Sequence, residues 1–201
     1  EGYPEITRVL KKPTETQNFG GVWHTDTIYL EKPPMASMLY AIDVPSTCGD
    51  TLFASQYKAY DALSSTLKEQ IKSYSAESRS DLEAVSATRL NRTSISNKAV
   101  SNNYSAIHPM VRTHPDTHLK SLYISPAHTC EVQGLTKSES RALLSELFWH
   151  QTKEDFQCRV KWRNGDLALW DNRCLLHLPL NDYHGVLRLL HRVTLKGDRP
   201  F

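Results

Sequence analysis

The residues of this 201-residue sequence that are best suited to chemistry are two histidines and one carboxylate. His24 and Asp26 stand two positions apart, and His177 follows far downstream. Two imidazoles and one carboxylate can occupy one face of a metal ion and leave the opposite positions open, the ligand set of a two-histidine, one-carboxylate iron site. Residues i and i+2 of an extended chain point to the same side, so we expect His24 and Asp26 to converge on one ion.

A His-x-Asp pair alone is weak evidence, because a chain with nine histidines contains such pairs by chance. The alternative interpretation is a surface or packing pair, and the metal-site interpretation depends on what lies at fixed distances from the pair. The turn Phe19-Gly20-Gly21 comes just before it and provides flexible backbone that can approach a ligand closely.

Two arginines in the last clear strand pattern indicate an anion. Over Arg188–Leu195, strand alternation places Arg188 and Arg192 on one face together with Leu190 and Thr194. A guanidinium does not lose its charge, so if this face points into the protein it needs an anionic partner there.

The rest of the sequence favours short strands with few helices. The expected strands are Met35–Ile42, Thr51–Phe53, Ser121–Ile124, Phe156–Trp162 and Leu167–Trp170, the last two joined as a hairpin by Asn164-Gly165. The expected helices are Gln56–Ser73, with a capping box at Thr66 and Glu69, and a helix from Thr136 to near Gln151, with a capping box at Thr136 and Glu139. This pattern predicts a mainly β fold, a sandwich or barrel with helical inserts.

Two segments carry little periodicity. Glu1–Asn18 is polar and is expected to be an irregular lead-in. Residues 75–105 are rich in Ser, Asn and Thr, and we expect a lid or a disordered insert there.

Composition limits the classes of protein that the chain can belong to. Hydrophobic residues make up 39% and charged residues 23%, which favours one globular domain over residues 1–201. The net charge of +2 without a Lys/Arg run gives no case for nucleic acid, and no apolar run is long enough for a membrane helix. The four cysteines are scattered, which favours free thiols in a reducing compartment, so we expect a cytoplasmic protein.

A set of motifs in fixed order resembles a known family. The set consists of His24-Thr25-Asp26, Gly49-Asp50-Thr51, the His108–Pro115 segment, Gly165-Asp166, Trp170–Arg173, His177, Arg188 and His191-Arg192. It is similar to the taurine dioxygenase / 2,4-dichlorophenoxyacetate dioxygenase family of Fe(II)- and 2-oxoglutarate-dependent oxygenases, from about Gly20 to Phe201.

The resemblance implies a double-stranded β-helix (jelly roll) and assigns roles. His24, Asp26 and His177 would hold Fe(II), Arg188 and Thr51 would bind the distal carboxylate of 2-oxoglutarate, and Arg192 would contact the substrate. The substrate would be a small, anionic organic molecule of the sulfonate, sulfate ester or aryloxyalkanoate type, hydroxylated with O2 while succinate and CO2 are released. Relatives often form homodimers or tetramers.

Each of these residues also has an alternative, structural role. Arg188 could form a structural ion pair, Thr51 could bond backbone in a turn, and Arg192 could pair with Asp171 or Asp50. Asp166, Asp171 and Arg173 are expected to form a turn network that supports His177, and His108, His114 and His191 are expected to be structural. The whole protein could also be a zinc-type metallohydrolase or a non-catalytic jelly-roll binding protein.

The sequence departs from the family at two points. Only 23 residues precede His24, fewer than family chains usually have. Gly20 stands where taurine dioxygenase carries an asparagine that helps to bind substrate, with Asn18 nearby.

Overall fold

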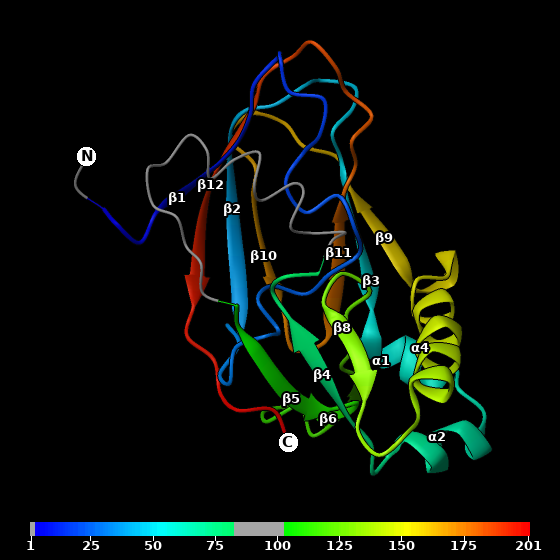
Figure 1. Cartoon of the computed structure of the whole chain (residues 1–201). Coiled ribbons are helices and arrows are strands. Elements are labelled where there is room, and N and C mark those ends of the chain that lie inside the picture. The colour runs from blue at the N-terminus through cyan, green and yellow to red at the C-terminus, as the bar shows by residue number, and fades with distance from the viewer. Residues whose placement is uncertain (1–2, 83–102) are drawn as a thin grey trace.

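The computed structural model describes residues 3–82 and 103–201, in which β-strands predominate, as the sequence predicts (Figure 1). The strands of the two sheets that carry the candidate site are β1 (Thr7–Lys11), β2 (Ala36–Asp43), β3 (Thr51–Ser55), β9 (Gln157–Val160), β10 (Leu167–Asp171), β11 (Leu175–Pro179) and β12 (Arg188–Leu195). The other strands are β4 (Ser75–Arg79), β5 (Ser105–Pro109), β6 (Val111–Thr113), β7 (Lys120–Leu122) and β8 (Thr129–Val132). The helices are α1 (Gln56–Asp61), α2 (Ser65–Ile71) and α4 (Lys137–Gln151), with a 3-10 turn η1 (Glu154–Phe156).

Two antiparallel sheets enclose the core that adjoins the candidate site. The first has the strand order β1-β12-β2-β10, and the second has the order β11-β3-β9. Strand alternation points one face of each inward: on β2, Leu39 and Ala41 are buried, whereas Tyr40 between them is 43% exposed. The buried side chains of this core are Leu39, Ala41, Phe53, Trp162, Trp170 and Leu190.

The described part of the N-terminal lead-in contains a strand that the sequence analysis missed. β1 pairs with β12 from Thr7 opposite Arg192 to Lys11 opposite Arg188. A strand of five residues gives a short alternation signal, and its partner lies at the other end of the chain. The pairing places β1 beside the strand that carries both arginines.

The predicted hairpin at Asn164-Gly165 is wrong in its pairing. The turn exists, with Gly165 at a φ of +90°, and strands flank it on both sides. However, β9 pairs with β3, and β10 pairs with β2, so the turn carries the chain from one sheet to the other.

The helices lie to one side of the sandwich and form a second apolar core with β4, β7 and β8 (Figure 1). Two helices, α1 and α2, replace the single one predicted over Gln56–Ser73. Ser64 caps α2, because its Oγ accepts from the Leu67 N–H (3.2 Å). The predicted capping box at Thr66 is therefore wrong. α4 begins with the predicted box: Thr136 Oγ1 accepts from the Glu139 N–H, and Glu139 Oε2 accepts from the Thr136 N–H. None of the helices in the described ranges has the length and apolar character needed to cross a bilayer.

The segment 75–105, expected to be a lid or insert, begins and ends in strands. β4 pairs with β5 along its length, and on its other side β4 pairs with β8. The centre of the segment, residues 83–102, lies outside the described residues, so the lid stays a prediction.

The capping box of α4 gives a first test of the fold. Thr136→Ala should lower the free energy of unfolding by about 1 kcal/mol, because the N-cap side chain no longer satisfies a helix N–H. Urea denaturation measures this. The matched control is Ser138→Ala, an exposed position in the first turn of the same helix, which should change stability by less than about 0.5 kcal/mol. Equal losses in the two variants would contradict the capping role.

Candidate metal centre and anion pocket

An isolated antiparallel bridge brings the first and last predicted ligands together. The His24 N–H donates to the His177 carbonyl oxygen (3.0 Å), and the His177 N–H donates to the His24 carbonyl oxygen (2.8 Å). His177 lies in β11, where it stands opposite Phe53 of β3. The two imidazole centroids are 4.0 Å apart. Backbone hydrogen bonds thus fix two residues from distant parts of the chain side by side.

Asp26 joins the two histidines through a turn rather than through an extended strand. Residues 26–29 form the turn, and the Leu30 N–H donates to the Thr27 carbonyl oxygen (3.0 Å). Asp26 Oδ1 lies 3.8 Å from His24 Nε2 and 3.8 Å from His177 Nε2. The three side chains therefore converge as expected, although the extended-chain reason for the convergence is wrong.

The separations of the three groups fit a shared ion better than direct hydrogen bonds. One donor atom from each residue lies within 4.8 Å of the other two. A separation of 3.8 Å is too long for a hydrogen bond, whereas two atoms that each bind one ion at about 2.0–2.2 Å can lie up to about 4 Å apart. His24 Nδ1 lies 2.7 Å from the Val22 carbonyl oxygen, which assigns the proton to Nδ1 and leaves the Nε2 lone pair directed at Asp26.

Burial keeps these groups in the protonation states that bind metals. It lowers the pKa of His24, and it lowers the pKa of His177 to about 3, so both imidazoles are neutral at pH 7. Burial alone would raise the pKa of Asp26, but His177 and Arg192 close to the carboxylate outweigh it and lower the pKa. The cluster therefore presents two neutral imidazoles and one carboxylate.

A chain of hydrogen bonds holds the second oxygen of Asp26. Ser37 Oγ donates to Asp26 Oδ2 (2.5 Å), Asn172 Nδ2 donates to Ser37 Oγ (2.9 Å), and Trp170 Nε1 donates to Asn172 Oδ1 (2.8 Å). All four residues are buried. Sequence reasoning missed Ser37, which stands alone in a strand pattern without a motif. The support from the Trp170–Arg173 segment differs from the prediction: it reaches Asp26 through Asn172 and Ser37, while Asp171 and Arg173 pair with each other and Asp166 accepts from the Arg163 N–H.

Two unusual backbone conformations lie next to the ligands. Gly20 has a φ of +75°, and a Cβ added there would lie 2.6 Å from His24 Cε1, so the predicted close approach of this turn is confirmed. Thr27, directly after Asp26, has a φ of +45°, which is rare for a β-branched residue. Such conformations occur where the surrounding structure fixes a functional side chain.

The predicted anion-binding residues share one small cavity with the three ligands. The cavity has a volume of about 40 Å³, enough for a few water-sized groups. Its lining includes all six residues that the sequence analysis singled out: His24, Asp26, Thr51, His177, Arg188 and Arg192. Val9, Phe19 and Pro179 also line it, so β1 and the lead-in contribute walls that the sequence analysis did not anticipate.

Arg188 is a buried cation without an ion-pair partner in the described residues. Its side chain is buried, its Nε donates to the Gly49 carbonyl oxygen (3.1 Å), and its Nη2 has no hydrogen-bond partner in the described part of the chain. The expected alternative, a structural ion pair, is therefore not formed. Thr51 Oγ1 accepts from Trp162 Nε1 (3.0 Å), so its lone pair is used while its own hydroxyl hydrogen can still be donated.

Arg192 lies between the ligands and a second cavity. Its Nη1 is 3.8 Å from Asp26 Oδ1, whereas Asp50 pairs with Arg159 and Asp171 with Arg173, so both structural partners suggested for Arg192 are wrong. The second cavity, of about 430 Å³, is also lined by Asp26 and Arg192. It therefore adjoins the same cluster.

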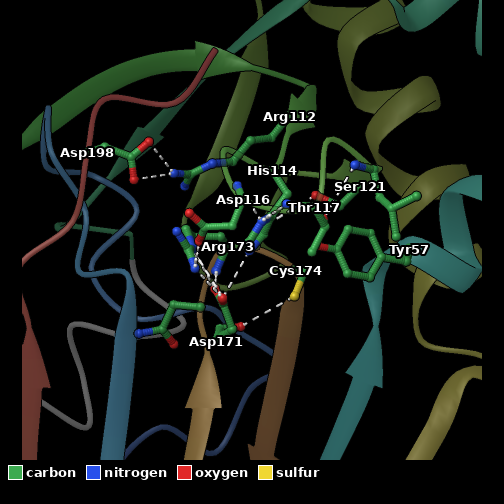
Figure 2. A network of polar contacts seen from close by, with 12 residues as sticks. Tyr57, Arg112, His114, Asp116, Thr117, Ser121, Asp171, Arg173, Cys174 and Asp198 are labelled. Carbon is green, nitrogen blue, oxygen red and sulfur yellow. Dashed lines mark hydrogen bonds and ion pairs between the residues drawn. The ribbon is translucent and has the colours of Figure 1, made fainter.

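A separate polar network contains the other charged residues that the motifs singled out (Figure 2). Arg173 donates to both carboxylate oxygens of Asp171 and lies 3.0 Å from Asp116. His114 Nε2 donates to Asp171 (3.0 Å), and His114 Nδ1 accepts from two backbone N–H groups. His114, Asp171 and Cys174 come close enough to hold a metal, but both nitrogens of His114 and both oxygens of Asp171 already have partners. The network is therefore structural.

Two further residues named in the sequence analysis also bond backbone. His108 Nε2 bonds the Leu30 carbonyl oxygen (2.9 Å), just after the turn that follows Asp26, which is the structural role expected for it. Asn18 Nδ2 donates to the carbonyl oxygens of Pro179 and Leu180. Asn18 thus ties the lead-in to the end of β11.

Comparisons with known proteins agree with this geometry. A family model described as "Taurine catabolism dioxygenase TauD, TfdA family" matches residues 1–194. A putative alpha-ketoglutarate-dependent sulfonate dioxygenase of Schizosaccharomyces pombe is 34% identical over 184 residues, which are 89% of this chain and 45% of that protein. The alpha-ketoglutarate-dependent 2,4-dichlorophenoxyacetate dioxygenase of Cupriavidus pinatubonensis is 36% identical over 178 residues, 88% of this chain and 60% of that protein.

A solved structure is similar over the whole chain. The crystal structure of a putative alpha-ketoglutarate-dependent taurine dioxygenase from Burkholderia xenovorans superposes with a TM-score of 0.81 at 33% identity, covering 100% of this chain and 67% of that one. The chain spans about half the length of the curated relatives that it matches.

The hydrogen-bond chain behind Asp26 predicts a loss of metal affinity. Ser37→Ala should weaken Mn(II) binding about 10- to 100-fold, because Asp26 loses the group that orients it. Isothermal titration calorimetry measures the affinity. Ser140→Ala, an equally buried serine that bonds backbone beside α4, is the matched control and should bind Mn(II) like the unchanged protein. Unchanged affinity in Ser37→Ala would remove Ser37 from this role.

The close approach of Gly20 predicts a second effect. Gly20→Ala should weaken Mn(II) binding more than Gly134→Ala does, because the new Cβ displaces the His24 ring, whereas nothing lies within 4 Å of a Cβ at Gly134. Both glycines have positive φ, so the backbone strain is common to the two variants. The same titration tests this, and equal affinities in the two variants would contradict it.

Proposed function

This chain belongs to the taurine catabolism dioxygenase TauD, TfdA family, and from this premise we propose that it carries the active site of an Fe(II)- and 2-oxoglutarate-dependent dioxygenase. Its substrate is a small, anionic organic molecule of the sulfonate, sulfate ester or aryloxyalkanoate type. His24, Asp26 and His177 hold the metal, Arg188 and Thr51 bind 2-oxoglutarate, and Arg192 contacts the substrate.

One observation carries the proposal. A buried guanidinium, Arg188, has no ion-pair partner in the described residues, and it lines the same cavity as two imidazoles and a carboxylate. Burying an unpaired charge is costly, so the site is complete only when an anion occupies it. A carboxylate matches a guanidinium in shape and can accept two parallel hydrogen bonds from it.

The donor set fits Fe(II). Two nitrogen ligands and one oxygen ligand, with His24 Nε2 unprotonated and Asp26 ionised, are the combination that Fe(II) oxygenases use. When bound, iron and 2-oxoglutarate supply the activation of O2, with release of succinate and CO2. The chain itself then has three tasks: it binds the metal and the cosubstrate, it orients them and the substrate, and it keeps water out of the site.

The residues of this chain divide those tasks. Ser37 and Asn172 hold Asp26 in one orientation, while Phe53 and Trp170 pack against the His177 ring at centroid distances of 6.0 and 4.9 Å. Arg188 and Thr51 form the end of the small cavity that receives the distal carboxylate of 2-oxoglutarate. The apolar walls of that cavity keep water away from the reacting groups.

Arg192 supports the substrate assignment. It lines both the small cavity and the 430 Å³ cavity, and its Nε is buried without a hydrogen-bond partner among the described residues. A metal ion bound to Asp26 would compete with Arg192 for the carboxylate, leaving the guanidinium to an anionic group of the substrate. The larger cavity lies beside it and suits the body of that molecule.

The alternative functions have less support. A zinc-type metallohydrolase accounts for the three ligands, but not for a buried guanidinium in the same cavity. A non-catalytic binding protein does not require Ser37 and Asn172 to orient Asp26. We further propose that residues 1–201 form one domain with the double-stranded β-helix topology of the family, in a cytoplasmic protein that forms homo-oligomers; its free cysteines suit a reducing compartment.

A succinate assay tests the function. The chain is purified without oxygen, mixed with Fe(II), 2-oxoglutarate, ascorbate and a panel of sulfonates, sulfate esters and aryloxyacetates, and then exposed to O2. We expect succinate above background with at least one substrate, and no such succinate from His177→Ala. Absence of succinate across the panel, with 2-oxoglutarate binding also absent, would contradict the proposal.

The role of Arg188 is tested separately. Arg188→Ala should raise the 2-oxoglutarate concentration needed for half-maximal turnover at least tenfold, because a charge-assisted hydrogen bond of about 1.5–3 kcal/mol is lost. Mn(II) affinity should change little. Arg141→Ala, which removes an exposed arginine on α4, is the control, and an unchanged 2-oxoglutarate dependence in Arg188→Ala would remove Arg188 from its role.

A further inference from the structure

Tyr183 lies behind Arg188, in the loop between β11 and β12. Its side chain is 2% exposed, and the Arg188 Cζ atom lies 6.0 Å from the centre of its ring. None of the motifs includes this residue, and it does not line the small cavity. Any effect of Tyr183 on the site must therefore pass through Arg188.

A second cation contacts the same ring. Lys11 Nζ, at the end of β1, lies 4.0 Å from the centre of the Tyr183 ring and donates to the Tyr183 carbonyl oxygen (2.5 Å). Lys11 is 2% exposed, and no carboxylate lies within ion-pair distance of it in the described residues. A buried ammonium without an acid partner is uncommon, and here the ring and one carbonyl oxygen take the place of the acid.

The backbone at Gly49 packs closely against the Tyr183 ring and the Arg188 side chain. A Cβ at Gly49 would lie 3.2 Å from Tyr183 Cδ1 and 3.4 Å from Arg188 Cδ. The Gly49 carbonyl oxygen accepts from Arg188 Nε, while the Gly49 N–H donates to Asp182 Oδ1 (2.7 Å). The glycine thus binds the arginine on one side and the loop that carries Tyr183 on the other.

We propose that Tyr183 and Lys11 are positioning residues for the cosubstrate, which hold the Arg188 guanidinium in the orientation that receives the distal carboxylate of 2-oxoglutarate. The inference rests on the proposed function. Lys11 fixes the ring from β1, the ring and hydroxyl of Tyr183 restrict the long side chain of Arg188, and Arg188 Nη2 has no hydrogen-bond partner among the described residues. A guanidinium that is already ordered loses less conformational entropy when the carboxylate binds.

The pairing of β1 with β12 makes this contact specific. Lys11 stands opposite Arg188 in the register of the two strands, so the pairing of β1 with β12 places the Lys11 ammonium close to Arg188. Val9, two residues earlier on β1, lines the small cavity itself. The N-terminal strand therefore contributes to cosubstrate binding twice, through a wall and through the support of Arg188.

The test measures 2-oxoglutarate binding to the Mn(II)-loaded chain by isothermal titration calorimetry. Tyr183→Leu and Lys11→Met should each raise the 2-oxoglutarate Kd about tenfold, because each removes a desolvated cation–π contact. Tyr183→Phe keeps the ring and loses only the hydroxyl, which also interacts with Arg188, so its Kd should lie between those of the unchanged chain and Tyr183→Leu. Mn(II) affinity, measured in the absence of 2-oxoglutarate, should stay the same in all three variants.

Matched controls exist elsewhere in the chain. Tyr123 is another buried tyrosine next to an arginine, with Arg112 Cζ 4.8 Å from its ring, and Lys153 lies 4.3 Å from the ring of Trp149. Tyr123→Leu and Lys153→Met remove similar contacts far from the anchor, and neither should change the 2-oxoglutarate Kd. Lys11→Met retains the apolar part of the side chain and serves as the decisive variant if Tyr183→Leu does not fold.

A double variant separates positioning from general stability. In an Arg188→Ala background, Lys11→Met should weaken 2-oxoglutarate binding no further, because the residue acts only through the arginine. An equal, additive loss in that background, or an unchanged Kd in the single Lys11→Met variant, would overturn the inference. If the unchanged chain binds no 2-oxoglutarate at all, the proposed function itself fails, and the two failures are thereby distinguished.

Discussion

The site depends on two backbone hydrogen bonds between His24 and His177. Each residue donates its N–H to the carbonyl oxygen of the other, so the two imidazoles are held next to each other without any contribution from their side chains. This matters because imidazole contacts alone would be weak, and burial removes the charge that could strengthen them. The other residues of the site are arranged around this bridge. Asp26 approaches both histidines from the following turn, and Gly20 leaves space for the His24 ring. Phe53 and Trp170 pack against the His177 ring.

Around that bridge the protein buries an unusual number of charges of both signs. Asp26 is balanced by Arg192 and oriented by Ser37, whereas Arg188 and Lys11 are buried without a carboxylate close enough for an ion pair in the described residues. A fold that contained such a group only for stability would lose more from desolvation than it gains. These unpaired charges are explained if a metal cation binds next to Asp26 and a dianionic keto acid binds next to Arg188.

Much of this could be predicted from the sequence, and the failures share one physical cause. The strands β2, β10 and β12, the capping box at Thr136 and the shared face of Arg188 and Arg192 follow from local periodicity and from residue chemistry. The strand β11, which carries His177, was not predicted, and His24 and Asp26 lie outside the named strands. Local periodicity cannot identify a strand's partner, so the turn at Gly165 was assigned to a hairpin although it joins two sheets, and β1 was missed although it pairs with β12. Ser37 acts through contacts with residues that are distant in sequence, and nothing in its own neighbourhood distinguishes it from an ordinary strand residue. Asn172 belongs to the Trp170–Arg173 motif, but its hydrogen bond to Ser37 joins positions 135 residues apart, so the motif does not reveal it. The contact of Tyr183 with Lys11 likewise joins distant parts of the chain.

The strand pairing described for β1 also has a consequence for how the protein acquires its site. Thr7 Oγ1 bonds the Arg192 carbonyl oxygen across a separation of 185 residues, and the His24–His177 bridge joins similarly distant segments. Contacts of such high contact order form slowly, because the entropy of closing a long loop must be lost before any contact compensates for it. During synthesis on the ribosome, β1 therefore lacks its pairing strand until β12 has emerged, so the wall and support that β1 gives to the site form only after the chain is nearly complete.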